Sequence, residues 1–385
     1  MKSEGIYLDN AATTYPKPEQ VYLAMDRFAR EVGGNPGRSG HRRSLEAGRV
    51  VLRAREAVAG LLGVKDPARI LFTKNATEAL NLVVRGALEE GGHAVITSLE
   101  HNSLWRPLEA LSRKGRASYT MVECRPDGTL EPSLVRDALR PDTRLIACTH
   151  ASNVLGALLP LDSLAEIAGE RNIPLLVDAA QTAGRYPLNP ENTGIQYLAF
   201  TGHKELFGPQ GTGGLYMAPG WEIEPLLFGG TGSRSESPIQ PDFLPDRYES
   251  GTLNALGLAG LKAGVDFVAA TGVGKIRKHE EELASRLIEG LERIPGVTVY
   301  GPREWTRRVG IVSFNLEGLT SSELASRLDE AFGICVRSGL HCSPLAHRTA
   351  GTLHGGTVRA GFSYMNTVED VDRLLEALRE IAALR

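Results

Sequence analysis

Short apolar runs and helical patterns alternate between residues 69 and 217. Apolar residues spaced three and four positions apart fill most of the intervals between the runs. This alternation predicts right-handed crossovers and a mostly parallel sheet with helices on both faces. In such a sheet, ligands gather at the carboxyl ends of the strands. The seven predicted strands lie at 69–73, 94–98, 117–122, 144–149, 174–178, 197–201 and 214–217.

Other patterns flank this block. Helices are predicted at 19–31 and 44–62, and the Gly/Pro-rich residues 33–41 between them predict a loop. After residue 220 the alternation is interrupted by the polar, Gly/Ser-rich segment 228–238, whose composition alone is that of a mobile linker. The remaining long helices are predicted at 253–271, 273–293 and 368–384.

Composition narrows the possible functions. The 385 residues suffice for two or three lobes, and the net charge of -3 gives no basic surface for nucleic acid. The first residues lack a signal-peptide pattern, and no apolar run is long enough to cross a bilayer. The four cysteines (Cys124, Cys148, Cys335 and Cys342) form no close pair, which disfavours a zinc site or a disulfide framework. We therefore expect a cytoplasmic protein with no nucleic-acid partner, no membrane partner and no bound metal.

One lysine stands at a position suited to chemistry. Lys204 follows an apolar run that ends in Thr-Gly-His-Lys, and a Gly/Pro-rich loop comes after it. Small residues there let a planar ligand approach, and a buried lysine loses proton affinity, as a Schiff-base nucleophile requires. The alternative is a solvated surface lysine beside an ordinary loop.

A carboxylate upstream strengthens this interpretation. Asp178 ends the apolar run 175–177 and is predicted at the carboxyl end of a strand. An aspartate at a protonated pyridine nitrogen and a lysine at the aldehyde are the two groups that hold pyridoxal phosphate. Taken by itself, Asp178 is equally well explained as the N-cap of a following helix.

Nine motifs in a fixed order carry a resemblance that covers almost the whole chain. They are YLDNAATT at 7–14, NATEALN at 75–81, EHNS at 100–103, SNVLG at 152–156, DAAQ at 178–181, TGHK at 201–204, ESGTLN at 249–254, RSGLHC at 337–342 and VRAGF at 358–362. With them the chain resembles the pyridoxal-phosphate-dependent class V aminotransferase family. Within that family it is most similar to cysteine desulfurases and selenocysteine lyases of the short-loop, group II type.

The resemblance implies a fold and a division into domains. The fold is the type I, α/β fold of pyridoxal-phosphate-dependent transferases, with a large, mostly parallel seven-stranded sheet whose last strand is antiparallel. A smaller α+β domain follows it. The implied parts are an N-terminal segment, 1–20, that packs with the small domain, a large cofactor-binding domain, 21–255, and a small C-terminal domain, 256–385, that carries the catalytic cysteine. A homodimer is implied as well, with segment 228–238 near the interface.

The resemblance also assigns residues to the cofactor. Lys204 and Asp178 hold its aldehyde and its ring nitrogen, Gln181 faces its phenolic oxygen, and His101 stacks on its ring and can move protons. Without the resemblance, His101 is an ordinary partly buried histidine. The phosphate is assigned to Ala76, Thr77, Thr201, His203 and, from the other subunit, Thr252. Ala76 and Thr77 open a predicted helix, whose free amides bind anions, although Thr77 is also explained as a simple helix cap.

A second set is assigned to the substrate. The planar guanidinium of Arg359 suits a substrate carboxylate, which Asn153 also contacts, or else the cofactor's phenolic oxygen. Ala11, His41 and Arg337 complete the set. Cys342 is the residue that a desulfurase needs, because a thiolate must attack the substrate sulfur, and His341 and Arg337 can favour that thiolate. Cys335 is interpreted as a structural thiol.

These assignments predict a cysteine desulfurase. L-cysteine becomes L-alanine, and sulfur passes to Cys342 and then to an acceptor protein or a small thiol. Alternatives are a selenocysteine lyase, another pyridoxal-phosphate-dependent aminotransferase or β-lyase, and a catalytically quiet cofactor-binding partner in a sulfur-transfer complex. A nicotinamide-binding protein is disfavoured, because no GxGxxG sequence opens the first strand–helix unit. The sequence departs from many short-loop relatives in having Leu340 before His341, where they have two histidines, and it lacks the long flexible insertion of the other desulfurase type.

Overall fold

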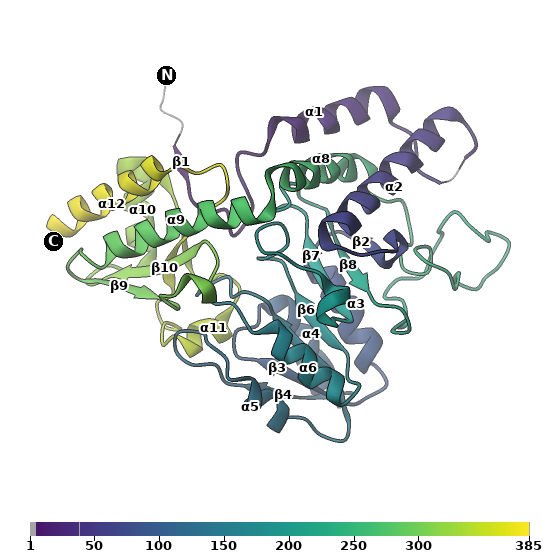
Figure 1. The fold of residues 1–385 in the computed structure, drawn as a ribbon, viewed down its shortest axis with the longest axis horizontal. Coiled ribbons are helices and arrows are strands. Elements are labelled where there is room, and N and C mark those ends of the chain that lie inside the picture. Colours follow the sequence, from purple (N-terminus) through teal and green to yellow (C-terminus); the bar gives the residue numbers. More distant parts are fainter. Residues whose placement is uncertain (1–4, 38, 385) are drawn as a thin grey trace.

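The computed structural model describes residues 5–37 and 39–384. Two lobes lie side by side: a large one built on a seven-stranded sheet, and a small one that contains the C-terminal helix (Figure 1). Among the described residues no single helix is long and apolar enough to span a membrane. The consecutive helices α8 (Ala255–Thr271) and α9 (Val273–Leu291) are long and apolar enough only when taken together, and the chain bends by 81° between them.

The large sheet contains all seven predicted strands. Its order is β2 (Ile70–Thr73), β8 (Gly213–Met217), β7 (Tyr197–Thr201), β6 (Leu175–Asp178), β5 (Thr143–Thr149), β3 (His93–Thr97) and β4 (Ser118–Val122). Strand β8 pairs antiparallel with both β2 and β7, and the other pairs are parallel. The prediction of a mostly parallel sheet with an antiparallel last strand is therefore confirmed.

Both faces of this sheet are buried, as the continuous apolar runs predicted. Successive residues of a strand point to opposite faces, so Leu198 and Phe200 join one core while Tyr197 and Ala199 join the other. Helices α3 (Ala76–Leu88) and α4 (Asn102–Arg113) cover one face. Helices α2 (Arg42–Leu62), α5 (Pro132–Asp137), α6 (Leu161–Glu170) and α8 (Ala255–Thr271) contribute to the core on the other.

The small lobe has a core of its own. Its antiparallel sheet has the order β12 (Arg337–Gly339), β13 (Thr357–Gly361), β10 (Ile311–Leu316) and β9 (Val297–Tyr300). Helices α9 (Val273–Leu291), α10 (Ser321–Phe332) and α12 (Val368–Ala383) supply the other apolar side chains. The change from one core to the other comes between α8 and α9 at Gly272, whose φ of 88° suits glycine.

The N-terminal segment crosses to the small lobe. Strand β1 (Ile6–Tyr7) pairs in parallel with β11 (Ile334–Cys335), and Ile6 and Leu8 lie in the small core. The predicted helix at 19–31 is observed as α1 (Glu19–Arg27), continued by a π-helical turn, Phe28–Val32. The domain boundaries at residues 20 and 255 stay predictions.

The remaining elements are short or irregular. They are α7 (Pro190–Thr193), α11 (Pro344–Thr349) and the 3₁₀ turns Pro67–Arg69 and Trp305–Arg307. Residues 218–254, which include the predicted linker, contain no helix or strand, and part of this segment projects as a loop from the large lobe (Figure 1).

Candidate active site

A cleft of about 230 Å³ lies at the carboxyl ends of β5, β6 and β7, where the small lobe meets the large one. All but two of the predicted site residues line it. They are Ala11, Ala76, Thr77, His101, Asn153, Asp178, Gln181, Thr201, His203, Lys204, Arg337, Cys342 and Arg359. No group of three metal-ligating side chains occurs among residues 5–37 and 39–384.

Asp178 is the last residue of β6, and Lys204 follows the end of the neighbouring strand β7 by three residues; both line the cleft. Burial lowers the pKa of Lys204 to about 8, and the charge of Asp178 opposes part of that shift. Burial also raises the pKa of Asp178, against the Ala180 amide, which donates to Oδ1 at 2.9 Å, and against the charge of Lys204. A fraction of Lys204 is thus free amine near neutral pH, and the buried carboxyl group of Asp178 interacts with its charge. The cap interpretation of Asp178 is not supported, since no helix of the described chain begins there.

The backbone of Lys204 is held by the N-terminal segment. The amide of Thr14 and the hydroxyl of Thr13 each donate to the carbonyl of His203 at 3.0 Å. The hydroxyl of Thr14 donates to the carbonyl of Lys204 itself, also at 3.0 Å. Sequence reasoning identified this threonine pair as part of a motif but gave it no role, because the contact spans 190 positions of chain.

One wall of the cleft is the start of α3. Asn75 caps this helix: its Oδ1 accepts the amide of Glu78 at 3.0 Å. The interpretation of Thr77 as the cap is therefore wrong, and its hydroxyl instead lies 2.7 Å from that of Ser103. Free amides at a helix start, with two hydroxyls beside them, suit an anion such as a phosphate.

Three other buried polar atoms of the described residues that line the cleft lack partners. Thr201 Oγ1, His203 Nδ1 and Gln181 Oε1 have no hydrogen-bond partner in the described part of the chain. Burial and the charge of Lys204 lower the pKa of His203 to about 4, so its imidazole is neutral and has one N–H to donate. Buried polar groups are rarely left unpaired, and these fit a ligand that brings hydrogen-bonding atoms into the cleft.

His101 also lines the cleft and is the N-cap residue of α4. Its Nδ1 accepts the amide of Ser103 at 3.1 Å and lies 2.8 Å from the Ser103 hydroxyl. Burial and the charge of Lys204 lower its pKa to about 4, so the ring is neutral. Ser103 was missed as a site residue; its place as the second residue of helix α4, which follows strand β3, was the available signal.

The small lobe supplies the cationic side of the cleft. Arg359, on β13, is fully buried and donates to Asp9 Oδ1 at 2.8 Å and to the carbonyl of Asn153 at 2.9 Å. Its Nε is buried and finds no partner among the described residues. Arg337 lies opposite Arg359 in the β12–β13 pair. Two guanidinium groups, one of them held from two sides, suit a carboxylate ligand.

Cys342 follows β12 and is exposed at the mouth of the cleft. The backbone around it is fixed: the amide of Asn102 donates to the Cys342 carbonyl at 2.9 Å. The Asn153 amide is used at both ends, since Nδ2 donates to the His341 carbonyl at 2.7 Å and Oδ1 accepts the Ser343 hydroxyl at 2.6 Å. Asn153 was predicted to contact substrate or cofactor, whereas its side chain here is engaged by the cysteine loop.

His341 differs from its predicted role. Its Nε2 faces the carbonyl of Arg337 at 3.3 Å, and burial and the charge of Arg359 lower its pKa to about 2. A neutral imidazole gives Cys342 no positive charge, so the expectation that His341 favours the thiolate finds no support in the structure.

Two predicted residues lie outside the cleft. His41 caps α2 by accepting the Ser44 amide at 3.2 Å and lines an exposed groove with α1 and α8. Thr252 is exposed in the segment before α8. A single chain brings neither of them to Lys204.

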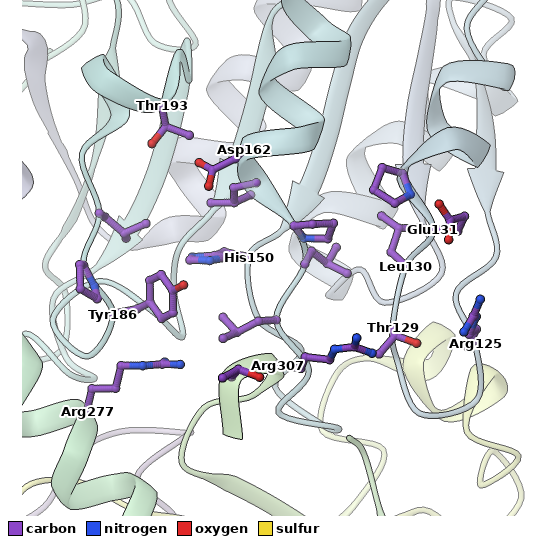
Figure 2. A pocket seen from close by; sticks show the side chains of 18 residues that line it. Arg125, Thr129, Leu130, Glu131, His150, Asp162, Tyr186, Thr193, Arg277 and Arg307 are labelled. Carbon is purple, nitrogen blue, oxygen red and sulfur yellow. The ribbon is translucent and has the colours of Figure 1, made fainter. Parts of the chain in front are cut away.

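A second cavity, of about 750 Å³, shares no lining residue with the cleft. Figure 2 shows His150, Tyr186 and Arg277 on one side of it and Arg125 and Thr129 on the other. It is larger than the cleft but has no lysine or cysteine in its lining. Chemistry rather than volume therefore identifies the site.

The sequence is similar to one family of known proteins over almost its whole length. The family described as aminotransferase class-V matches residues 6–374. A probable cysteine desulfurase of Methanothermobacter thermautotrophicus is 37% identical, over 99% of this chain and 96% of its own. A cysteine desulfurase of Haloferax volcanii is 33% identical, over 97% of this chain and 88% of its own.

Solved structures are similar over the same span. The apo structure of a cysteine desulfurase from Thermococcus onnurineus superposes with a TM-score of 0.93 at 35% identity, over 99% of this chain and 96% of that one. The crystal structure of the Escherichia coli cysteine desulfurase CsdA, in an S-sulfonic acid form, gives 0.90 at 28% identity, over 100% and 96%.

Proposed function

Because this chain belongs to the class-V aminotransferase family, we propose that it is a cysteine desulfurase, which removes sulfur from L-cysteine and leaves L-alanine. One observation carries the proposal: a buried lysine of lowered pKa, Lys204, and an exposed thiol, Cys342, share a single cleft with a buried arginine, Arg359. An aminotransferase needs the amine and the arginine but has no use for the thiol.

The cofactor of this proposal is pyridoxal 5′-phosphate. Its phosphate would lie between the start of α3, at Ala76 and Thr77, and the unpaired Thr201 and His203. Asp178 would pair with its ring nitrogen, Lys204 would hold its aldehyde, and Gln181 and His101 would contact the ring. When bound, this group supplies an electron sink for the bonds of the substrate's α-carbon.

The side chains of the chain then divide the remaining work. Arg359 binds the substrate carboxylate, with Arg337 beside it. Lys204, whose lowered pKa leaves a fraction as free amine near neutral pH, takes the proton from the α-carbon. The thiolate of Cys342 attacks the substrate sulfur: an S–S bond forms, the C–S bond breaks, and the carbon that keeps the electron pair takes up a proton to give alanine.

Delivery of the sulfur follows from the exposure of Cys342. The persulfide on this residue is accessible to an acceptor protein or a small thiol, and the short loop keeps transfer close to the cleft. A homodimer belongs to the proposal, with Thr252 and His41 of one subunit facing the site of the other. A cytoplasmic location is a further part of it.

An absorption spectrum before and after L-cysteine is added tests the proposal. We expect a yellow protein whose band changes with cysteine, together with equal amounts of alanine and transferred sulfur. The variant Cys342→Ala should keep the colour and lose sulfur release from cysteine. A band that responds without sulfur release from the wild type would instead favour an aminotransferase, and sulfur release that survives in Cys342→Ala would overturn the role of Cys342.

A further inference from the structure

The turn that carries Cys342 has an unusual backbone. His341 and Cys342 both lie in the left-handed region, with φ of 51° and 57°. Side chains other than glycine and asparagine rarely adopt this conformation, and two in succession require support from the surroundings. The supports described above, from Asn102 and Asn153, act on the carbonyls of the turn.

A second support acts on the His341 ring. His341 Nδ1 lies 3.1 Å from His347 Nε2, and His347 Nδ1 lies 2.8 Å from the hydroxyl of Thr352. The two ring planes lie at 19° to each other with centroids 5.3 Å apart, so the rings lie side by side as an N–H···N bond requires. All three residues are buried.

The hydrogen-bond donors in the series Thr352, His347 and His341 can be assigned by starting from the Arg337 carbonyl. The Arg337 carbonyl only accepts, so His341 Nε2 carries the hydrogen that it shares with that carbonyl. In a neutral ring, His341 Nδ1 is then an acceptor, and His347 Nε2 must donate to it. His347 Nδ1 is left as an acceptor for the Thr352 hydroxyl. Each group has one role, and the series runs from Thr352 to the strand that precedes Cys342.

The position of His347 is one where an apolar residue is expected. It lies on α11 with an exposed fraction of 0%, and it is not among the described residues that line the cleft. A buried imidazole costs free energy unless both nitrogens are paired. Burial and the charge of Arg359 lower the pKa of His347 to about 4, which agrees with a neutral imidazole at this position.

We propose that His347 is a positioning residue for Cys342: its Nε2–H···Nδ1 bond to His341 holds the left-handed turn that presents the Cys342 sulfur to the cleft. Thr352 selects the tautomer of His347 that makes this bond possible. The consequence for sulfur transfer rests on the proposed desulfurase function, whereas the effect on the turn itself does not.

Two substitutions of His347 separate the hydrogen bond from the volume. His347→Leu fills the space without a donor, while His347→Gln places an amide N–H near the position of Nε2. With L-cysteine, we expect kcat to fall by about tenfold or more in His347→Leu and to stay within about threefold of the wild type in His347→Gln. With L-selenocysteine, whose selenium leaves without the thiol, both variants should stay within about threefold.

Hydrogen exchange gives a readout that needs no turnover. Exchange of the peptide 337–343 should be faster in His347→Leu than in the wild type and should return to the wild-type rate in His347→Gln. Thr352→Val, which removes the hydroxyl and keeps the shape, should give a smaller change of the same sign and serves if His347→Leu fails to fold.

His93 offers a matched control. His93 is equally buried and has both ring nitrogens 2.8 Å from threonine hydroxyls. It is the first residue of β3, however, and so lies at the amino end of its strand, whereas the cleft lies at the carboxyl ends of the strands. His93→Leu should leave the exchange of 337–343 and the ratio of the two substrates unchanged.

Two results would overturn the proposal. One is unchanged exchange of 337–343 in both His347→Leu and Thr352→Val; the other is equal loss of cysteine and selenocysteine turnover in His347→Leu without rescue by His347→Gln. Failure of the wild type itself to release sulfur would instead count against the proposed function, and the exchange experiment would still decide the role of His347.

Discussion

At the scale of single residues, the environment of Lys204 has a consequence that can be measured without cofactor. Burial lowers the pKa of this amine from 10.5 to about 8. At neutral pH the fraction of free amine is then about 300-fold larger than for an ordinary lysine. Competitive acetylation of the cofactor-free protein, quantified by mass spectrometry, should show Lys204 half-maximally reactive near pH 8, once reagent access is normalised.

The exposed Lys65 provides the internal reference for reagent concentration. Asp178→Asn should shift the midpoint for Lys204 downward, because the carboxylate is the group that opposes the effect of burial. A midpoint for Lys204 near pH 10 would show that the amine is solvated and would remove the physical argument for its reactivity.

Residues of the site were predictable where a motif fixes both chemistry and place. Asp178 ends β6, Arg359 lies within β13 and Lys204 follows β7 by three residues, and the structure brings them to one cleft. The use of the Asn153 amide was not predictable, because its partner Ser343 lies 190 positions away. A side chain that can donate and accept is assigned only by tertiary contacts.

At the scale of elements, strand β8 approaches the start of α3 more closely than a side chain would allow. A Cβ added to Gly213 would lie 2.6 Å from the Asn75 Cα and 2.8 Å from the Phe200 carbonyl oxygen. Both are backbone atoms, so the helix start itself must move. We expect Gly213→Ala to lower the free energy of unfolding by about 1–3 kcal/mol, measured by urea unfolding of the cofactor-free protein.

The same substitution tests the anion site proposed at the start of α3, which we call the cradle. Because Asn75 caps α3 beside Ala76 and Thr77, its displacement should weaken pyridoxal phosphate binding by about tenfold, a cost of about 1.4 kcal/mol. Gly60→Ala is the control: its Cβ meets no atom within 4 Å inside helix α2. It should stabilise by about 0.5–1 kcal/mol and leave cofactor affinity unchanged. Equal affinity in Gly213→Ala and wild type would mean that the cradle tolerates a displaced helix start.

The elements themselves were largely predictable from the apolar pattern. All seven strands of the large sheet lie within one residue or two of the predicted runs, because strands buried on both faces are continuous apolar segments. The antiparallel direction of β8 came only from the resemblance, since an apolar run does not encode strand direction. The π-helical turn Phe28–Val32 had no signal in the pattern.

At the scale of the whole molecule, one buried arginine connects the two lobes behind the cleft. Arg185 follows β6, pairs with Glu205 next to Lys204, and lies 3.5 Å from Glu280 on α9. It also donates to the Phe362 carbonyl at 3.2 Å, just beyond β13, which carries Arg359. All three charged side chains are almost completely inaccessible. One cation thus ties together the segments that hold the amine and the carboxylate-binding guanidinium.

The charges of this cluster do not balance if both carboxyl groups are ionised. Burial raises the pKa of Glu205 and, more strongly, that of Glu280, so folding favours the protonated form of Glu280. Removing Arg185 leaves buried charge without a partner. We therefore expect Arg185→Met to lose about 3–5 kcal/mol of unfolding free energy, whereas Glu280→Gln, which resembles the protonated carboxyl group, should lose less than about 1 kcal/mol near pH 5.

The dependence on pH gives the sharper test of this assignment. A carboxyl group whose pKa is raised by folding binds more protons in the folded protein than in the unfolded chain. The free energy of unfolding of the wild type therefore falls as pH rises above the ordinary value of 4.5, by up to about 1.4 kcal/mol per pH unit for one proton. Glu280→Gln lacks this proton, so its stability relative to the wild type should increase between about pH 5 and about pH 7. Urea unfolding of both cofactor-free proteins at the two pH values measures the difference directly. A constant difference would mean that Glu280 is already ionised at pH 5 in the folded state, so that it faces Arg185 as a full negative charge.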